Sequence, residues 1–170
     1  LEIAIKKGAS IVIGTTGLTN EQMEIIKKAS KTIPIVTSPN MSMGINILLD
    51  LVEKFAEKMS NYDVEIVEIH HNKKKDSPSG TALRLAEAVA KGMQKDLKKN
   101  AVYGRYGADA LRKQGEIGIH AVRGEDVVGE HTIYFAGIGE RIEISHKASS
   151  RENLASGALK AAKWLDNKPA

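Results

Sequence analysis

Residues 68–82, EIHHNKKKDSPSGTA, decide how this chain folds and what it can bind. They place two adjacent histidines at the end of an apolar strand, then a lysine-rich loop, then a Ser-Gly-Thr turn that opens a helix. A helix start offers unpaired backbone N–H groups and the positive end of the helix dipole, which suit a carboxylate or a phosphate. His70, His71 and Lys74 add a titratable pair and a fixed positive charge. Together these groups predict a pocket for a small polyanion with an acid available to protonate it.

Less specific interpretations of these residues stay open. Lys73, Lys74 and Lys75 would form a solvated loop in most proteins, and two histidines can simply end a strand. Clusters of ionisable groups occur often at functional sites, but they also occur in purely structural ion-pair networks. Spacing alone therefore does not decide between a site and an ordinary loop.

The identity of the residues favours a site. The window resembles the His-His-x-x-Lys-x-Asp-x-Pro-Ser-Gly-Thr-Ala pattern of the dihydrodipicolinate reductase family, in which it forms the substrate site. The matching positions are His70, His71, Lys74, Asp76, Pro78, Ser79, Gly80, Thr81 and Ala82. The resemblance extends over essentially the whole chain, with Glu125 standing where the family usually carries glycine.

Composition excludes several other classes of protein. The 170 residues suit one or two small domains, and 42% apolar residues support a packed core. Aromatic residues make up only 4%, which disfavours a platform for stacking single-stranded nucleic acid. The net charge of +4 favours an acidic small molecule and does not by itself predict DNA binding. The lack of cysteine excludes disulfides and thiolate chemistry. With no apolar run of membrane-spanning length and no visible signal peptide, we expect a soluble cytoplasmic protein.

The first 38 residues are typical of the trailing part of a doubly wound sheet. Residues 1–8 look like the last turns of a helix closed by glycine. Residues 10–13 and 33–37 have the apolar character of buried parallel strands. Between them, residues 19–22 form a capping box that starts a second helix.

The rest of the chain predicts an open mixed sheet with helices. Helices are expected at about 43–60, after Ser79 and after Ser150, and strands at 62–69, 116–123, 127–136 and 141–147, with a long loop at 99–114 and turns at 124–125 and 137–139. The predicted fold class is α/β. It comprises the C-terminal part of a Rossmann-like dinucleotide-binding domain (1–41 and 151–170) and an α+β substrate-binding and tetramerisation domain (42–150).

Small residues follow the first two expected strands. Gly14-Thr15-Thr16-Gly17 is weak as a motif, because such residues are also ordinary turn chemistry. Ligands nevertheless bind outside the carboxyl ends of strands in open parallel sheets. The resemblance implies that these segments contact a nicotinamide cofactor, NADH or NADPH. The candidates are Gly14, Thr15, Thr16, Ser38, Pro39, Asn40 and Met41.

The glycine-rich dinucleotide turn is missing from the chain. Its sequence contains no G-x-G-x-x-G between a strand and a helix and no ribose-selecting residue after one. In the family that turn lies upstream of the position of Leu1. We therefore expect a chain without the N-terminal part of the nucleotide-binding domain, inactive alone, and the choice between NADH and NADPH stays open.

The resemblance implies the reduction of 4-hydroxy-tetrahydrodipicolinate (dihydrodipicolinate) to tetrahydrodipicolinate in diaminopimelate and lysine biosynthesis. Whether the hydroxylated or the dehydrated dicarboxylate reacts stays open. We assign His70 as the general acid and Lys74 as its partner in proton delivery or charge stabilisation. A carboxylate would be held by His71, the Ser79 hydroxyl and the backbone N–H groups of Gly80 and Thr81. A side chain at Gly80 would obstruct that anion.

The other histidines and the assembly complete the expectations. His120, His131 and His146 lie on expected strands, where a buried, hydrogen-bonded histidine is the commoner state. No zinc-site spacing is recognisable, so no metal is expected. The resemblance implies a homotetramer built through the open face of the sheet, with hinges near residues 40–41 and 150–151 that would let the substrate half close over the cofactor.

Two alternatives from other functional classes remain. One is an isolated, non-catalytic dicarboxylate-binding half. The other is a basic polyanion-binding module that would use residues 73–75 and 95–99 as phosphate contacts and bind nucleic acid in a salt-dependent way.

Overall fold

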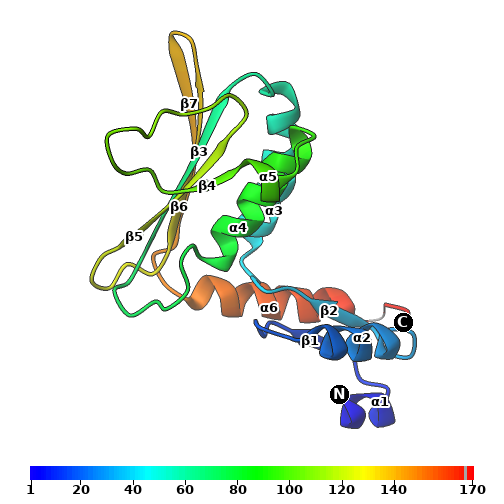
Figure 1. The fold of residues 1–170 in the computed structure, drawn as a ribbon. Coiled ribbons are helices and arrows are strands. Elements are labelled where there is room, and N and C mark those ends of the chain that lie inside the picture. Colours follow the sequence, from blue (N-terminus) through cyan, green and yellow to red (C-terminus); the bar gives the residue numbers. More distant parts are fainter. Residues whose placement is uncertain (167) are drawn as a thin grey trace. The chain divides into compact units, whose positions relative to one another are not determined.

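A computed structural model describes residues 1–166 and 168–170 of the chain (Figure 1). They form two compact units. Unit 1 comprises Leu1–Met43 and Glu152–Ala170, and unit 2 comprises Gly44–Arg151.

Unit 1 has the expected α-β-α-β order, followed by the last helix of the chain. Its elements are α1 (Glu2–Lys7), β1 (Ile11–Ile13), α2 (Asn20–Ala29), β2 (Ile35–Thr37) and α6 (Glu152–Leu165). β1 and β2 pair in parallel, and α6 contacts both strands. The sequence signals at the helix ends are confirmed. Gly8 closes α1 with a φ of 61°, and Thr19 and Gln22 form the capping box of α2.

Unit 2 is a five-stranded mixed sheet with helices on one face (Figure 1). Its elements are α3 (Met43–Lys58), β3 (Asp63–His70), α4 (Gly80–Gly92), α5 (Leu97–Asn100), β4 (Ala101–Tyr103), β5 (Ile117–Arg123), β6 (Glu130–Gly137) and β7 (Glu140–Lys147). The strand order is β4-β5-β3-β6-β7. The central strand β3 runs parallel to β5 and antiparallel to β6.

The core of unit 2 lies between the sheet and its helices. Alternate residues of β3, Val64 and Ile66, are fully buried against this layer, and Glu68 and His70 continue the same face. The helix face predicted from the sequence is confirmed. The buried residues of α4 include Ala82, Ala86 and Val89, and Met93, which directly follows the helix, is buried as well.

Two sequence expectations were wrong. Residues 99–114 are not one long loop, because 97–100 form α5 and 101–103 form β4, which pairs in parallel with β5. Three residues are too few for a strand period to show in the sequence. Residues 124–125 do not close a hairpin either, since β3 lies between β5 and β6.

The connection from β5 to β6 instead passes the end of β3. Gly124 N–H donates to the carbonyl oxygen of His70 at 2.9 Å, and Asn72 N–H donates to that of Glu125 at 3.1 Å. Glu125, which stands in place of the family's glycine, has a φ of 21°. This crossing brings residues of β5 and β6 to the end of β3, where the candidate site lies.

The close approach of α3 and α4 depends on Gly92. A Cβ built on Gly92 would overlap the carbonyl oxygen of Glu53 on α3. In a solvent-exposed helix, alanine is more stabilising than glycine by about 1 kcal/mol. At position 92, however, α3 and α4 would have to move apart to accept the alanine side chain. Gly92→Ala is therefore expected to lower the free energy of unfolding by about 1–3 kcal/mol, measured by urea denaturation.

Gly80→Ala, in the same helix, is the matched control. No atom lies within 4 Å of a Cβ at Gly80, so its stability should stay within about 0.5 kcal/mol of wild type. Equal denaturation midpoints for the two variants would contradict the packing explanation.

Candidate functional site

The candidate site is built around a buried carboxylate, that of Glu68 near the end of β3. Its side chain has no exposed surface. The Glu68 Oε2 atom lies 2.5 Å from His70 Nδ1 and 3.0 Å from an Arg123 guanidinium nitrogen. Its Oε1 atom accepts the backbone N–H of Ser79 and the second Arg123 nitrogen, both at 3.0 Å. One carboxylate thus joins the end of β3 to the end of β5 and the start of α4.

Arg123 reaches this position because β5 is parallel to β3. In the register of the two strands Arg123 stands opposite His70, so both side chains lie at the same edge of the sheet. Arg123 also donates to the carbonyl oxygen of Asp76 at 2.8 Å, which ties the lysine-rich loop to the sheet.

The hydrogen bonds decide the charge of Glu68. Burial alone would raise the pKa of its carboxyl group. Hydrogen bonds from His70, Arg123 and the Ser79 backbone outweigh burial and lower that pKa to about 2. Glu68 is therefore an anion at neutral pH.

Ser79 links the Glu68 carboxylate to His131, because its N–H binds Glu68 and its hydroxyl lies beside the His131 ring. Ser79 caps α4, its Oγ accepting the N–H of Ala82 at 3.1 Å and lying 3.1 Å from His131 Nε2. The rings of His131 and His70 meet edge to face, with centroids 5.1 Å apart. The expectation of a buried, hydrogen-bonded His131 is confirmed. The hydroxyl of Ser79 is bonded inward, so its predicted contact with a ligand stays a prediction.

The other two strand histidines differ from His131. His120 is half-buried and lies 2.6 Å from Glu65 on the opposite face of the sheet. His146 is half-buried beside His131 in the strand register, and its Nδ1 has no hydrogen-bond partner among the described residues. His146 is therefore less buried than predicted.

Cationic groups form the rim of the site. His71 Nε2 lies 3.3 Å from the guanidinium of Arg151, and Lys74 Nζ lies 2.9 Å from Asp76. Burial lowers the pKa of His71, and the positive charges of Arg151, His70, Lys74 and Arg123 lower it further. As expected for adjacent strand residues, His70 and His71 occupy different environments, one buried and one at the rim.

The start of α4 faces this rim. No atom lies within 4 Å of a Cβ built on Gly80, so the helix start has open space beside it. The carboxylate of Asp76 is hydrogen-bonded by Lys74 and by the backbone of Gly80, and these bonds lower its pKa. Asp76 thus occupies the backbone donor of Gly80 that we expected a ligand carboxylate to use, and it pairs with Lys74, which we assigned to proton delivery or charge stabilisation.

The cofactor candidates all lie in unit 1 and meet at one edge of its two strands. Gly14, Thr15 and Thr16 follow β1 and are exposed, and residues 38–41 follow β2. Ser38 N–H donates to the carbonyl oxygen of Ile13 at 3.1 Å. A Cβ at Gly14 would lie 3.4 Å from Met41 Cγ. The exposed backbone at the carboxyl ends of parallel strands fits a nucleotide.

The loop after β2 is also braced from within. Ser38 Oγ donates to the carbonyl oxygen of Asn40 at 2.8 Å, and the side-chain oxygen of Asn40 accepts the N–H of Ser42 at 2.9 Å. Gly157 of α6 packs against the backbone of Met41 so closely that a side chain there would overlap it.

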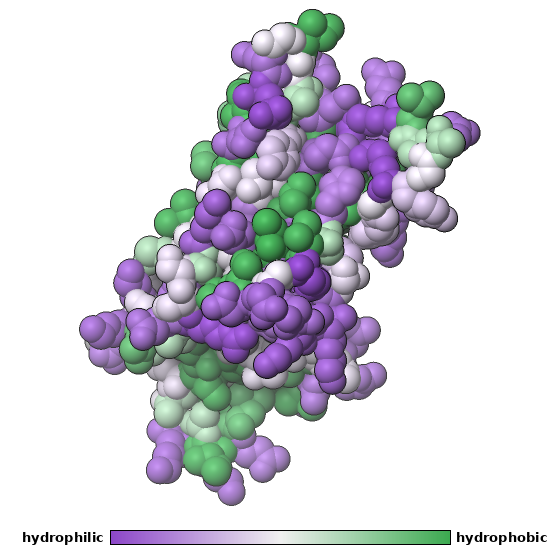
Figure 2. Space-filling view, turned by 90° about the vertical axis from the view of Figure 1, so that its left-hand side faces the viewer, coloured by the Kyte–Doolittle hydropathy of each residue, from purple (hydrophilic) through white to green (hydrophobic). Residues whose placement is uncertain are grey.

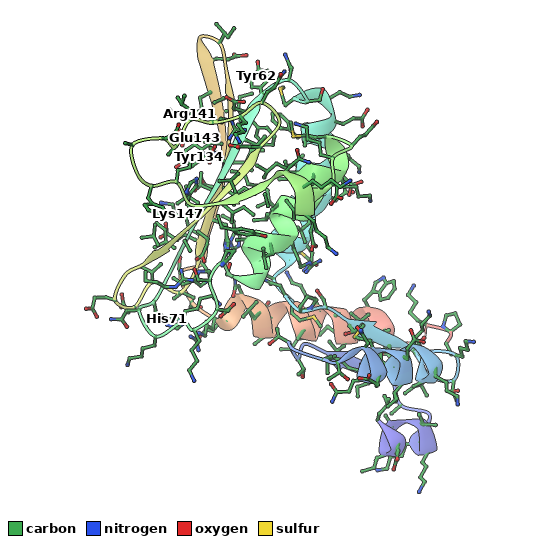
Figure 3. All side chains as sticks on the ribbon, viewed as in Figure 1. Tyr62, His71, Tyr134, Arg141, Glu143 and Lys147 are labelled. Atoms are coloured by element: carbon green, nitrogen blue, oxygen red, sulfur yellow. The ribbon has the colours of Figure 1, made fainter. Side chains whose placement is uncertain are left out.

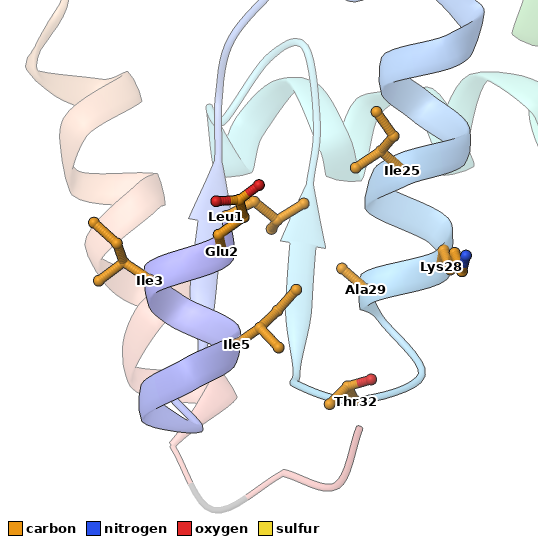
Figure 4. Close-up of a pocket in the computed structure, with 8 residues that line it drawn as sticks. All are labelled: Leu1, Glu2, Ile3, Ile5, Ile25, Lys28, Ala29 and Thr32. Carbon is orange, nitrogen blue, oxygen red and sulfur yellow. The ribbon is translucent and has the colours of Figure 1, made fainter.

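An apolar pocket lies elsewhere in unit 1. It holds about 620 Å³ between α1 and α2 and is lined largely by apolar side chains such as Ile3, Ile5 and Ile25 (Figure 4). None of the predicted site residues lines it. Among the described residues there is also no group of three potential metal ligands and no helix long and apolar enough to span a membrane.

Comparison with known proteins places these features in a family. The N-terminal family model of dihydrodipicolinate reductase matches residues 1–41, and the C-terminal one matches residues 44–170. The 4-hydroxy-tetrahydrodipicolinate reductase of Lawsonia intracellularis is 54% identical over 96% of the chain and 64% of its own length. That of Aquifex aeolicus is 52% identical over 98% of the chain and 62% of its own length. The chain thus spans less than two thirds of these relatives.

A solved structure agrees with the sequence matches. It is a dipicolinate-bound dihydrodipicolinate reductase from Paenisporosarcina sp. TG-14, with a TM-score of 0.69 and 26% identity. The match covers 96% of this chain and 62% of that one. It confirms the predicted fold class, a Rossmann-like part joined to an α+β part with a mixed sheet.

Burial of His131 makes the stability of unit 2 depend on pH. Burial, and to a smaller extent the charge of His70, lowers the pKa of His131 from its ordinary 6.5 to about 4. The unfolded chain takes up a proton near pH 6.5 and the folded chain only near pH 4, so acidification across this range favours unfolding. The share of His131 in that loss is on the order of 3 kcal/mol.

His131→Gln tests this contribution. The variant has no titrating group at this position, so its free energy of unfolding should fall less steeply between pH 6.5 and pH 4 than that of wild type. His146, whose pKa is also lowered by burial, leaves some slope in the variant. Urea denaturation across this range provides the measurement, and parallel curves would rule the contribution out.

Proposed function

Because the chain belongs to the dihydrodipicolinate reductase family, we propose that it carries the dicarboxylate-binding and proton-donating site of a 4-hydroxy-tetrahydrodipicolinate reductase. The observation that carries this proposal is the buried Glu68–His70 pair beside a cationic rim and an open helix start. Such a site offers one acid and several anion-binding groups. The reaction would belong to diaminopimelate and lysine biosynthesis, in the cytoplasm.

The proposed reaction adds a hydride and a proton to a cyclic imine dicarboxylate. When bound, NADH or NADPH supplies the hydride. His70 supplies the proton as general acid, and Lys74 stabilises the negative charge that develops in the ring as the hydride arrives. Gly14, Thr15, Thr16 and residues 38–41 would hold the nucleotide, supported by their meeting at the carboxyl edge of β1 and β2.

The substrate's carboxylates would replace Asp76 at the start of α4. Lys74 and the backbone of Gly80 already bind a carboxylate there, that of Asp76. A ligand carboxylate of the same chemistry can take over these donors, with Thr81 N–H and His71 beside them. Ser79 then contributes mainly by holding the helix start in place.

The open face of the sheet supports assembly into a homotetramer. The face of β6 and β7 away from the helices bears Tyr134, Arg141, Glu143 and Lys147 (Figure 3). Arg141 bonds Glu143 at 2.7 Å and lies over the Tyr134 ring. On this side of the molecule, hydrophilic and hydrophobic residues are intermixed (Figure 2). A surface with both signs of charge and apolar area can pair with a second copy of itself.

Lys74→Ala tests the dicarboxylate site. Calorimetric titration with pyridine-2,6-dicarboxylate, a planar mimic of the substrate, should show saturable binding to this chain. The variant loses a charged hydrogen bond worth about 1.5–3 kcal/mol, so its Kd should rise about tenfold to a hundredfold.

Lys73→Ala is the matched control for that titration. Lys73 belongs to the same loop but is exposed, and should leave the Kd unchanged. An equal loss of affinity in both variants, together with wild-type binding that weakens as salt is added, would favour the polyanion-binding module instead. Absence of binding to wild type would count against the dicarboxylate site in this chain.

Tyr134→Asp tests the assembly. The change removes an aromatic ring from the proposed interface and places a second carboxylate opposite Glu143, so sedimentation equilibrium should show a shift from tetramer to smaller species. Lys98→Asp, on the exposed surface of α5, changes charge without touching the open face and should keep the wild-type mass. A monomeric wild type, or a tetrameric Tyr134→Asp, would refute the proposed interface.

A further inference from the structure

We propose that Glu68 is a positioning residue that fixes the proton of His70 on Nδ1 and leaves Nε2 as the atom that delivers a proton to the ligand. The catalytic consequence rests on the proposed function. The placement of the proton itself rests only on hydrogen bonds within unit 2, and can be tested without any turnover.

The partners of Glu68 leave one arrangement of protons. The Ser79 N–H and the two Arg123 nitrogens are donors that cannot act as acceptors. The ionised carboxylate accepts only. The remaining contact, 2.5 Å from Glu68 Oε2 to His70 Nδ1, is therefore satisfied when Nδ1 carries a proton and donates it. In the neutral ring this leaves the lone pair on Nε2.

The surroundings hold the ring in this orientation. Only 11% of the His70 side chain is exposed, and the edge-to-face contact with His131 supports one side of it. Beside Nε2 lies Gly129 of the crossing segment, where a Cβ would come within 2.9 Å of that nitrogen. Glycine at this position keeps a space next to Nε2 that a side chain would fill.

This arrangement separates the two ring nitrogens by role. In the protonated ring the Nε2–H bond breaks, the proton bonds to the substrate, and the electron pair stays on Nε2. The Nδ1–H bond to Glu68 remains unchanged, because Arg123 and Ser79 N–H keep the carboxylate ionised. The ring returns to its charged form by taking a proton from solvent at Nε2. Glu68 itself touches neither substrate nor cofactor in this scheme.

Glu68→Gln reverses the arrangement. The amide offers one acceptor and one donor, yet must still accept from Ser79 N–H. Among the partners of residue 68, only His70 can change from donor to acceptor. The amide NH₂ should therefore turn toward Nδ1, which loses its proton, and the neutral ring should carry hydrogen on Nε2.

Nitrogen-15 NMR of the imidazole rings reads this tautomer directly. In the wild-type chain at alkaline pH, His70 should show a protonated Nδ1 and an unprotonated Nε2, and Glu68→Gln should show the reverse. In a form extended to the length of its relatives, the variant should lose about a hundredfold or more in kcat. Its KM should change by less than about threefold, since Glu68 does not contact the substrate.

Glu65→Gln is the matched control. Glu65 lies on the same strand but the opposite face, and it too is paired with a histidine and arginines, His120, Arg105 and Arg112. Its loss costs a comparable set of ion pairs without touching the site. The His70 spectrum and kcat should therefore stay as in wild type.

Each outcome decides a separate question. A wild-type His70 protonated on Nε2, or an unchanged tautomer in Glu68→Gln, overturns the positioning role. The wild-type spectrum provides this test even if the variant does not fold. The expected tautomers together with wild-type protein that neither binds dicarboxylate nor turns over would overturn the proposed function and leave the positioning role standing.

Discussion

The structure of unit 2 depends on one buried anion. A carboxylate without exposed surface is very costly unless charged and polar groups surround it, so Glu68 requires partners from several elements. Arg123 reaches it from β5, Ser79 from the start of α4, and His70 from its own strand. The parallel pairing of β3 with β5 is what brings Arg123 to the correct edge. Removing one of these partners would leave the buried charge of Glu68 incompletely paired. The interactions that form the site therefore also stabilise the local fold.

The same strand carries a second carboxylate network on its other face. Glu65 lies over Gly118, where any side chain would overlap it, and pairs with Arg105, Arg112 and His120. These arginines belong to the loop at 104–116, which lies on the side of the sheet opposite α3 and α4 (Figure 1). Because side chains alternate along β3, the two carboxylates lie on opposite faces of the sheet. Glu65 binds the arginines of the loop, and Glu68 binds the residues of the candidate site.

Sequence patterns predicted the elements whose signals are local. The closing glycine of α1, the capping box of α2 and the inward face of α4 each depend on a few neighbouring residues, and all three were correct. The strand β4 was missed because its three residues gain their structure only by pairing with β5. Strand order was missed for the same reason. A turn signal at Gly124 cannot reveal that β3 lies between the strands it connects.

The site shows the same division. His70, His71 and Lys74 were proposed from the sequence because they lie close together in one motif. Arg123 and His131 were not assigned to the site, since they reach it only through the sheet. Glu68 did carry a signal. It is in phase with the buried residues Val64 and Ile66, and a carboxylate at such a position requires a cationic partner. The sequence does not reveal which cationic residue pairs with Glu68.

The charges of the site favour a dianionic ligand. In the interior, the anion of Glu68 and the cation of Arg123 offset each other, and His131 adds no charge because burial keeps it neutral. At the rim, the cations of Lys74 and Arg151 lie beside one carboxylate, that of Asp76. Asp76 relieves part of this excess by bonding Lys74 and the start of α4. One intramolecular carboxylate cannot neutralise the whole rim, so a ligand with two carboxylates gains both the displaced bonds and the remaining charge.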